Sequence, residues 1–518
     1  MSYARPGVYL SERLLPPSLP QGGTANAAGA VVAPFQGGPE AVTLVTSWYQ
    51  FTQIFGGYNA SFPATFEVGA FFQNGGRELY VKRLLHYDST HSPSAATVSL
   101  VTSSSAVVAT VTALNAGADG NNLRVTSEAG TVSGTYILTV YREGVAGTSS
   151  DVSNDILLER YENLVFSDST STSYGVSVVN SLSSYIKLTI GASPSGAITP
   201  AVYPLTGGND GLTVTCADYI NYKADDVSPF DELNATNRAL VLFIPGLWSL
   251  PTGIDTDGTT TLAQTDVLLA ASSWASANGG FLVADAATGQ TVTNVKSLAT
   301  TLSGYSTTAL YYPNTYIADP VGRSSSALRL IGCSGSVAGL YLATDNQTGP
   351  FKAPAGIQTA LKGVVALESV LAPADLDTLN SGSNPVNAIR QIPGAGFAVM
   401  GARTLLQDGT ANKYVNMRRS LIYIERELKN LTEFAIFENN DEKLWSKLNT
   451  VIGSFLNEYR NQGGLRGATA AQAYFVRCDA TNNTYTTIAN GEVHIQVGVA
   501  LQYPAEFVVI NLSQSTLS

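Results

Sequence analysis

The most regular β pattern in this 518-residue sequence stands next to its C-terminus. Every second residue is apolar over the run Val493, Ile495, Val497, Val499, Leu501 and Tyr503. This period of two indicates a strand with one buried face, and Pro504, which has no N–H, interrupts it. A second apolar run follows at Phe507, Val508, Val509 and Ile510. An apolar strand in this position either folds back as an internal strand or pairs with a neighbouring chain.

The first residues of the chain have a similar character. A short extended run, Val8, Tyr9, Leu10 and Ser11, is followed by Pro16, Pro17 and Pro20 and then by two glycines. Prolines favour an extended, semi-rigid arm. Both ends of the chain therefore predict short strands on tethers that add to sheets of neighbouring subunits. The strand around Val493, Ile495, Val497 and Val499 is the predicted sheet that receives such arms.

Charged residues make up 13% of the chain, against about 25% in ordinary soluble proteins. This scarcity fits a protein that buries much of its surface in an assembly, although secreted β-proteins share it. The net charge of -11 argues against a nucleic-acid binder, which needs a basic stripe. Cys216, Cys333 and Cys478 lie far apart and are odd in number, so we expect no structural disulfide and synthesis in a reducing compartment. We expect neither a signal peptide nor a membrane span.

The composition changes along the chain, which is too long for one hydrophobic core. Between Thr97 and Pro200 it is rich in Ser, Thr, Val and Gly and alternates like β-strands. A Gly-rich segment at 203–211 precedes alternating strand and helix patterns. We predict an α+β multidomain fold, with an α/β core built from N- and C-terminal segments, an inserted α/β domain, an outer mostly-β domain and extended terminal strand arms. The predicted units are an N-terminal arm (1–20), a first core segment (21–88), an outer β-rich insertion (89–205), a middle α/β domain (206–385), a C-terminal core (386–503) and a C-terminal arm (504–518).

Two amphipathic helices are predicted in the C-terminal core. The first has one apolar stripe at spacings of four and three residues: Met417, Leu421, Ile424, Leu428 and Leu431. The second has a similar stripe: Leu444, Leu448, Val451, Phe455 and Tyr459. Asn439 and Glu442 are spaced as a capping box for this second helix, and Gly463 with Gly464 can end it.

The sequence contains no recognisable catalytic or metal-binding motif. His86 and His91 flank Asp88, but two histidines in a loop at a domain boundary are more often solvated than metal-bound. The chain has three histidines in all, so a Ser-His-Asp triad has few options. There is no Walker A motif and no GxGxxG after a strand. We therefore predict a structural protein rather than an enzyme, with no catalytic residue, metal or cofactor.

Several motifs, in order along nearly the whole chain, resemble the sheath proteins of contractile phage tails and related contractile injection systems. They include "PGVYLSE" at 6–12, "AFFQNGGRELYVKRL" at 70–84, "SVAGLYLATDNQTGPFKAPAG" at 336–356 and "NAIRQIPGAGFAVMGARTL" at 387–405. The densest match is "YVNMRRSLIYIERELKNLTEFAIFENNDEKLW", which starts at Tyr414. The outer insertion resembles the family only at its edges.

This resemblance implies a subunit that stacks in a helical array around an inner tube and shortens to drive the tube through a target envelope. It implies as partners further copies of the chain, the tail tube protein, and baseplate and tail-terminator proteins, with neither nucleic acid nor direct membrane insertion. It places the C-terminal core near the tube, the insertion outward and the terminal arms on neighbouring subunits. The implied location is the tail sheath of a virion, made in the cytoplasm of a bacterial host.

Basic residues concentrate in 401–470, which holds ten of the 28 Lys and Arg residues of an acidic chain. Arg418, Arg419, Arg426 and Lys429 are candidates to face an acidic tube through weak, salt-sensitive pairs. The alternative is ordinary helix-surface charge, because acidic residues are interspersed.

Other protein classes stay open on the sequence alone. A headless injection system uses the same kind of sheath as a phage. A surface-layer or shell protein would also polymerise, but into a lattice with one length. A secreted glycan-active enzyme would need a cleft with paired carboxylates.

Overall fold

The computed structural model describes residues 27–87, 91–144, 152–221, 228–255, 258–322, 327–382, 384–408 and 410–506. Both predicted arm strands, Val8–Ser11 and Phe507–Ile510, lie outside these residues, as does Asp88. No helix in the described ranges is both long and apolar enough to cross a membrane.

Among the described residues, eight strands form the main sheet in the order β2-β3-β1-β11-β14-β15-β19-β20. Neighbours from β3 to β19 pair in parallel, and the edge strands β2 and β20 are antiparallel. Parallel strands are covered on both faces and therefore read as continuous apolar runs. The strands are β1 (Ala27–Ala33), β2 (Thr43–Val45), β3 (Leu79–Arg83), β11 (Ala239–Phe243), β14 (Phe281–Asp285), β15 (Thr308–Tyr312), β19 (Asn387–Ile392) and β20 (Gly396–Val399).

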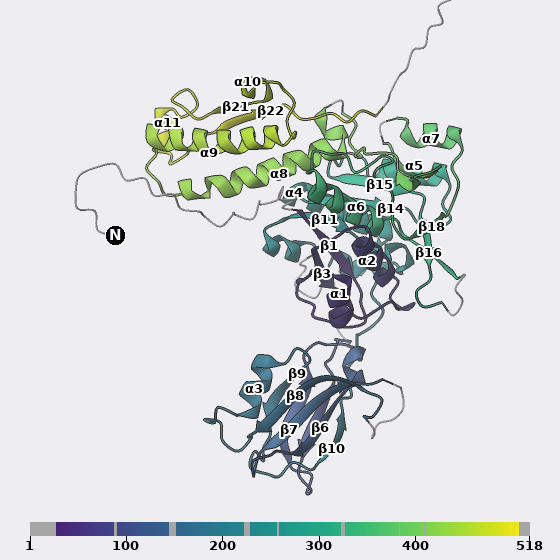
Figure 1. Ribbon diagram of the computed structural model, residues 1–518, viewed down its shortest axis with the longest axis vertical. Coiled ribbons are helices and arrows are strands. Elements are labelled where there is room, and N and C mark those ends of the chain that lie inside the picture. Colours follow the sequence, from purple (N-terminus) through teal and green to yellow (C-terminus); the bar gives the residue numbers. More distant parts are fainter. Residues whose placement is uncertain are drawn as a thin grey trace, which may run out of the picture.

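Helices cover both faces of the main sheet (Figure 1). Alternate side chains along β11 show the two faces: Leu240 and Leu242 belong to one core, and Val241 and Phe243 to the other. The first core includes α4 (Gln264–Asn278), α5 (Val292–Thr301) and α7 (Pro373–Asn380). The second includes α1 (Trp48–Phe55), α2 (Ala64–Gln73) and α6 (Ser334–Gln347).

This sheet differs from the predicted division of the chain. Segments 21–88 and 206–385 were predicted as parts of separate domains, yet β1 pairs with both β3 and β11 in one sheet. Periodicity along a sequence predicts that a strand exists and which face it buries, but it does not select its partner strand. The pairing of Ala27 with Ala239 spans the whole insertion and therefore had no local signal.

The outer insertion has its own hydrophobic core, formed only by residues between Ala95 and Leu205. It lies at the lower end of the molecule in Figure 1. One sheet has the order β4-β5-β9 and the other β10-β6-β7-β8, which agrees with the predicted mostly-β character. Its elements are β4 (Thr97–Val101), β5 (Val107–Ala113), η1 (Ala118–Asn122), β6 (Leu123–Ala129), β7 (Tyr136–Arg142), β8 (Ile156–Leu164), α3 (Gly175–Leu182), β9 (Ile186–Ile190) and β10 (Ala201–Pro204).

Short elements connect the larger ones. A small sheet, β17-β16-β18, and a short pair, β12-β13, lie beside the main sheet. These elements are η2 (Cys216–Tyr219), η3 (Asp231–Thr236), η4 (Leu247–Ser249), β12 (Gly253–Ile254), β13 (Thr261–Leu262), β16 (Thr315–Ala318), β17 (Leu328–Ile331) and β18 (Val364–Leu367).

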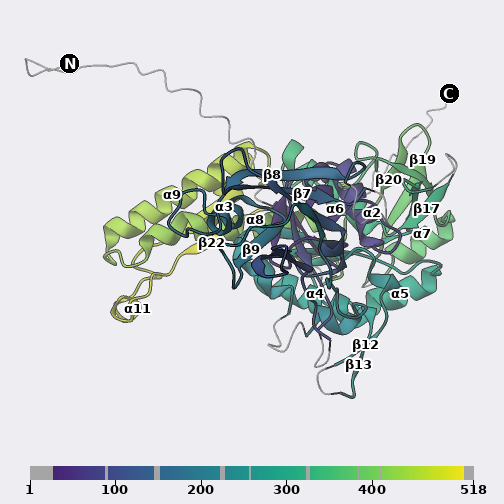
Figure 2. The ribbon, with the colours of Figure 1, turned by 90° about the horizontal axis from the view of Figure 1, so that it is seen from below.

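The last described portion of the chain, residues 410–506, forms what we call the C-terminal unit, at the other end of the molecule from the insertion (Figure 1). Seen from below, its helices α8 and α9 project to one side of the main sheet (Figure 2). The unit contains η5 (Ala411–Lys413), α8 (Val415–Thr432), η6 (Glu433–Ala435), α9 (Glu442–Asn461), α10 (Ala470–Ala473), β21 (Tyr474–Arg477), α11 (Tyr485–Ala489) and β22 (Gln496–Val499).

Both predicted amphipathic helices are confirmed as α8 and α9, but the predicted cap of α9 is wrong. Asp441, rather than Asn439, is the N-cap, and its carboxylate accepts hydrogen bonds from the N–H groups of Lys443 and Leu444. A carboxylate at this position satisfies free N–H groups of the first turn and interacts favourably with the helix dipole.

Candidate assembly surface in the C-terminal unit

Strands β21 and β22 form an antiparallel sheet at the surface of the C-terminal unit. Tyr474 pairs with Val499, and Val476 with Val497. These four side chains pack on a core made with α8 and α9. One face of the sheet is thereby covered, as the apolar alternation predicted.

The outer edge of β22 carries no strand among the described residues. The N–H of Ala500 donates to the carbonyl of Ala473 at 2.8 Å, so this residue faces the β21 side. Backbone direction alternates along an antiparallel strand. Val497 and Val499 therefore direct their N–H and C=O groups to the open edge. Such an edge is a template for strand addition by another chain.

Strand β22 is shorter than predicted. Of the four predicted receiving residues, Val497 and Val499 lie in β22, whereas Val493 and Ile495 precede it. The side chain of Asn483 occupies the place of a partner strand there: its Oδ1 accepts from the N–H of His494 at 2.7 Å, and its Nδ2 donates to the His494 carbonyl at 3.0 Å. Val493 packs on a small core around Trp445, and Ile495 contacts both this core and the one beneath β21 and β22.

The last described residues of the C-terminal unit are held by hydrogen bonds to Arg403 and α8. Arg403 donates two hydrogen bonds to the carboxylate of Glu506, at 2.8 and 2.7 Å. Asn416 on α8 donates to the carbonyl of Gln502 at 3.1 Å. These contacts anchor the segment that immediately precedes the predicted arm strand at Phe507. No local pattern pointed to the bidentate pair, since its members are 103 positions apart.

Arg419, predicted to face the tube, is instead buried. Its side chain is 4% exposed and forms a bidentate ion pair with Asp345 of α6. Its guanidinium also lies 4.8 Å from the centroid of the Tyr341 ring. The stripe of α8 did not reveal this role, because periodicity assigns a face to Arg419 but not a partner on another helix. Arg419 therefore joins α8 of the C-terminal unit to α6, a helix that packs on the main sheet.

The other three basic candidates on α8 lie at or near the surface. Arg418 is half-buried, 3.7 Å from Glu425. Arg426 and Lys429 line a cleft of about 350 Å³ together with Arg238. Burial and the charge of Arg238 lower the pKa of Arg426. Its Nη1 is buried without a hydrogen-bond partner in the portion of the chain that the structure describes.

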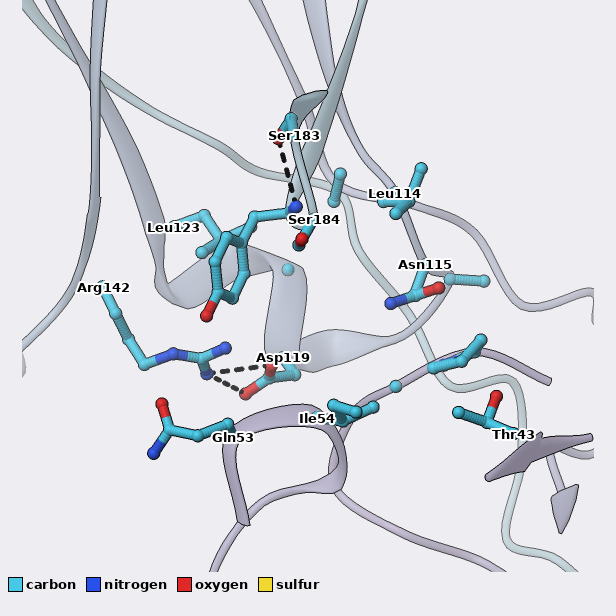
Figure 3. A pocket seen from close by; sticks show the side chains of 17 residues that line it. Thr43, Gln53, Ile54, Leu114, Asn115, Asp119, Leu123, Arg142, Ser183 and Ser184 are labelled. Carbon is cyan, nitrogen blue, oxygen red and sulfur yellow. Dashed lines mark hydrogen bonds and ion pairs between the residues drawn. The ribbon is translucent and has the colours of Figure 1, made fainter. Parts of the chain in front are cut away.

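A larger cleft, of about 470 Å³, lies between the insertion and the main sheet (Figure 3). Its charged lining residues are Asp119 and Arg142, which are hydrogen-bonded to each other at 2.9 Å. Nearby, the buried Arg83 donates to the carbonyls of Gly38 and Ala116 and to Asp210. Arg83 thus links the main sheet to the insertion at Ala116 and to the segment after it at Asp210, whereas Asp119 and Arg142 pair within the insertion. The described lining of the cleft has no histidine or paired carboxylates for acid–base chemistry.

His86, one of the two histidines considered for a metal site, lies beside the carboxylate of Asp218. His86 Nδ1 is 3.0 Å from Asp218, and no group of three or more potential metal ligands occurs among the described residues. The three cysteines are buried and free.

Comparisons with known proteins agree with the resemblance seen in the motifs. Residues 407–515 match the family model described as phage tail sheath C-terminal domain. The tail sheath protein of Vibrio phage KVP40 is 29% identical over 185 residues, which make up 35% of this chain and 26% of that protein. That of Enterobacteria phage T4 is 25% identical over 165 residues, 32% of this chain and 24% of that protein. The chain thus spans about a quarter of the length of these relatives.

Solved structures extend the likeness over nearly the whole chain. The helical sheath of the anti-feeding prophage in its contracted state has a TM-score of 0.57 at 22% identity, covering 99% of this chain and 100% of that one. A sheath tail protein from Listeria innocua has a TM-score of 0.60 at 12% identity, and the match covers 92% of this chain and 95% of that one. The chain has the mixed α/β fold of these sheath proteins, and its resemblance to contractile tail sheath proteins is confirmed.

Proposed function

We propose that this chain is the structural subunit of a contractile tail sheath. Copies polymerise helically around an inner tube and contract to drive the tube through the envelope of a target cell. The observation that carries the proposal is the open edge of β22 beside an anchored C-terminal segment. The likeness to sheath proteins of phages and injection systems supports it.

The terminal arms are the proposed couplers between subunits. Residues 1–20 and 504–518 add strands to the β21–β22 sheets of neighbouring copies, at the edge formed by Val497 and Val499. A ladder hydrogen bond contributes roughly 0.5–1.5 kcal/mol net, so an added strand of four to six bonds contributes several kcal/mol. The Pro- and Gly-rich segment 16–23 and the turn at Pro504 are the proposed hinges that let such a link survive rotation of the subunits, whereas a side-chain interface would have to separate.

The remaining domain assignments follow from this arrangement. We propose that the insertion, 89–205, faces outward and that the C-terminal core, 386–503, faces the tube. In this arrangement Arg418, Arg426 and Lys429 contact acidic groups of the tube protein, while Arg419 stays in its ion pair. The proposed partners are other copies of the chain, the tube, the baseplate and the tail terminator, and the proposed location is the tail of a virus particle.

Deletion of residues 1–15 tests the proposal. We expect the shortened chain to remain a folded monomer, by circular dichroism and gel filtration, and to form no tubular polymers in negative-stain electron microscopy. Full-length protein under the same conditions is the control. Normal polymers from the shortened chain would refute the coupling role of the N-terminal arm.

The other protein classes are separated by the same images. Polymers of two lengths and widths support a contractile sheath, while flat or closed lattices of one spacing support a shell protein. Turnover of a polysaccharide by the purified chain would favour a glycan-active enzyme. Capsid and terminase genes beside the gene for this chain would indicate a phage, and their absence a headless injection system.

A further inference from the structure

Two carboxyl groups approach each other beside the main sheet, away from the open edge of β22. Glu67 lies on α2 and is 4% exposed, and Asp285 ends β14 and is 5% exposed. Both approach Gly332: a Cβ atom at that position would lie 2.3 Å from Asp285 Oδ2 and 2.8 Å from Glu67 Oε2. The two carboxyl groups therefore share one small buried space.

The hydrogen bonds to this pair come from neutral groups. Glu67 accepts from the N–H of Gly246 at 2.9 Å and from the hydroxyl of Ser334 at 2.9 Å. Asp285 accepts from the N–H of Ser334 at 3.1 Å and from the indole N–H of Trp248 at 3.2 Å. Neither carboxyl has an ion pair with a described Lys, Arg or His residue.

The other titratable groups around the pair offer no compensating charge. These groups are Cys333, which precedes α6, Tyr219 on η2, and Glu368, which follows β18. The negative charge of Glu67 contributes to raising the pKa of both Cys333 and Tyr219, and that of Glu368 contributes at Cys333. Burial raises the pKa of the Cys333 thiol and of the Tyr219 hydroxyl well above their usual values. Arg329 lies over the Phe66 ring but is bonded to Asp319 at 3.0 Å.

Two negative charges this close in a buried, neutral site are costly, so one carboxyl stays protonated at neutral pH. Burial, and then the charge of Asp285, raise the pKa of Glu67 to about 8. Burial also raises the pKa of Asp285. Like-charge carboxyl pairs of this kind titrate together, so the proton belongs to the pair.

We propose that Glu67 and Asp285 hold one proton between them, and that this shared proton is a pH-sensitive lock that fixes α6 against α2 and the ends of β11 and β14. The backbones of α2 and α6 are in close contact. A Cβ atom at Gly335 would lie 2.3 Å from the carbonyl oxygen of Glu67, and a Cβ atom at Gly339 would lie 2.3 Å from the carbonyl oxygen of Phe71. This lock concerns the folded subunit and does not depend on the proposed function.

The direction of the pH effect follows from the raised pKa. The folded state holds a proton that the unfolded chain releases near the ordinary pKa of 4.5. The stability contributed by the protonated pair is full below that value and is lost as the pH rises to about 8. Within this window the unfolding equilibrium constant gains up to about tenfold per pH unit from this one proton.

The test compares the full-length chain with E67Q, which keeps the shape of the side chain but removes the shared proton. Chemical denaturation is measured between about pH 5 and pH 9, with E128Q, a change at an exposed carboxyl of β6, as the control. We expect the wild type and E128Q to lose stability as the pH rises, with E67Q losing clearly less. An E67Q profile parallel to the wild type would overturn the lock.

Infrared spectroscopy gives a second readout that does not require a stability measurement. The wild type is expected to show the C=O stretch of a protonated, buried carboxylic acid at neutral pH, and E67Q is expected to lack it. D285N, in which burial still raises the pKa of Glu67, is expected to keep the band at a shifted frequency. If E67Q does not fold, the band in the wild type and its shift in D285N decide the matter. A wild type without this band at neutral pH would overturn the proposal.

Discussion

The insertion and the C-terminal unit are both regions with small β-sheets, but they differ in how complete they are. In the described portion of the insertion two sheets face one shared core. The described sheet of the C-terminal unit stops at β21 and β22, with helices on one side and an open edge at Val497 and Val499. A pair of strands is only marginally stable by itself. The difference indicates that the insertion completes its own fold, whereas the C-terminal sheet is suited to receive more strands.

Their charges differ in the same way. In the insertion Arg124 pairs with Glu143 and Asp155, Arg142 with Asp119, and Arg160 with Glu162. In the C-terminal unit Arg426 has a buried Nη1 without a hydrogen-bond partner among the described residues. These arginines of the insertion are thus paired within it, whereas Arg426 of the C-terminal unit has a donor left unsatisfied within the described ranges.

The largest effect is expected where the C-terminal unit joins the sheet. Arg419→Met leaves Asp345 buried without its partner, which costs about 3–5 kcal/mol of unfolding free energy. Denaturant unfolding of the monomer measures this loss. The double variant Arg419→Met/Asp345→Leu is the control and should recover most of it, because removing both charges leaves no unpaired group. A single variant as stable as the wild type would mean that the C-terminal unit is held by other contacts.

The next effect compares two fully buried leucines, Leu138 in the insertion and Leu456 on α9. Either change to alanine should cost about 3 kcal/mol through lost burial and a cavity. Hydrogen exchange is expected to report the loss within the insertion for Leu138→Ala and within α8, α9 and β22 for Leu456→Ala. Only the second variant should impair polymer formation. Impaired assembly of Leu138→Ala with the insertion still protected would break the contrast between the two regions.

A smaller, positional effect tests the open edge of β22. Val497→Pro removes one N–H that faces away from β21, at a cost of roughly 0.5–1.5 kcal/mol per added strand. We expect a folded monomer that assembles at a higher critical concentration, measured by sedimentation. Val497→Ala controls for the side chain. Gln496→Pro removes an N–H on the β21 side and should instead disrupt the monomer's own sheet. Equal behaviour of the two proline variants would contradict the assigned edge.

The smallest effect is expected for the basic groups at the α8 cleft. Arg426→Gln and Lys429→Gln should each weaken binding of the sheath to a purified tube by about 0.2–1 kcal/mol, with the difference shrinking as salt is added. Lys187→Gln, on the exposed surface of β9 in the insertion, is the matched control and should have no effect. Loss of binding that is insensitive to salt would point to packing rather than charge.

Local patterns in the sequence were sufficient to predict several helices and strands of this protein. The stripes of α8 and α9, the alternation from Val493 to Val499 and the polar β-rich insertion are signals carried by neighbouring residues, and they indicated helices, a one-faced strand and a mostly-β region. The family motifs added the assembly. These properties can be predicted from sequence because buried side chains recur at the regular spacing of a helix or a strand.

Only the tertiary structure decided which distant residues meet. It joined β1 to β11, placed Arg419 against Asp345, gave Asn483 the role of a strand partner to His494 and brought Glu67 to Asp285. None of these pairs has a periodic signal, since each depends on how layers pack after the elements have formed. Burial then changes the chemistry of the side chains: an Arg or Glu that would be a surface charge by its sequence pattern becomes a buried ion-pair partner or a carboxyl group with a raised pKa once water is removed.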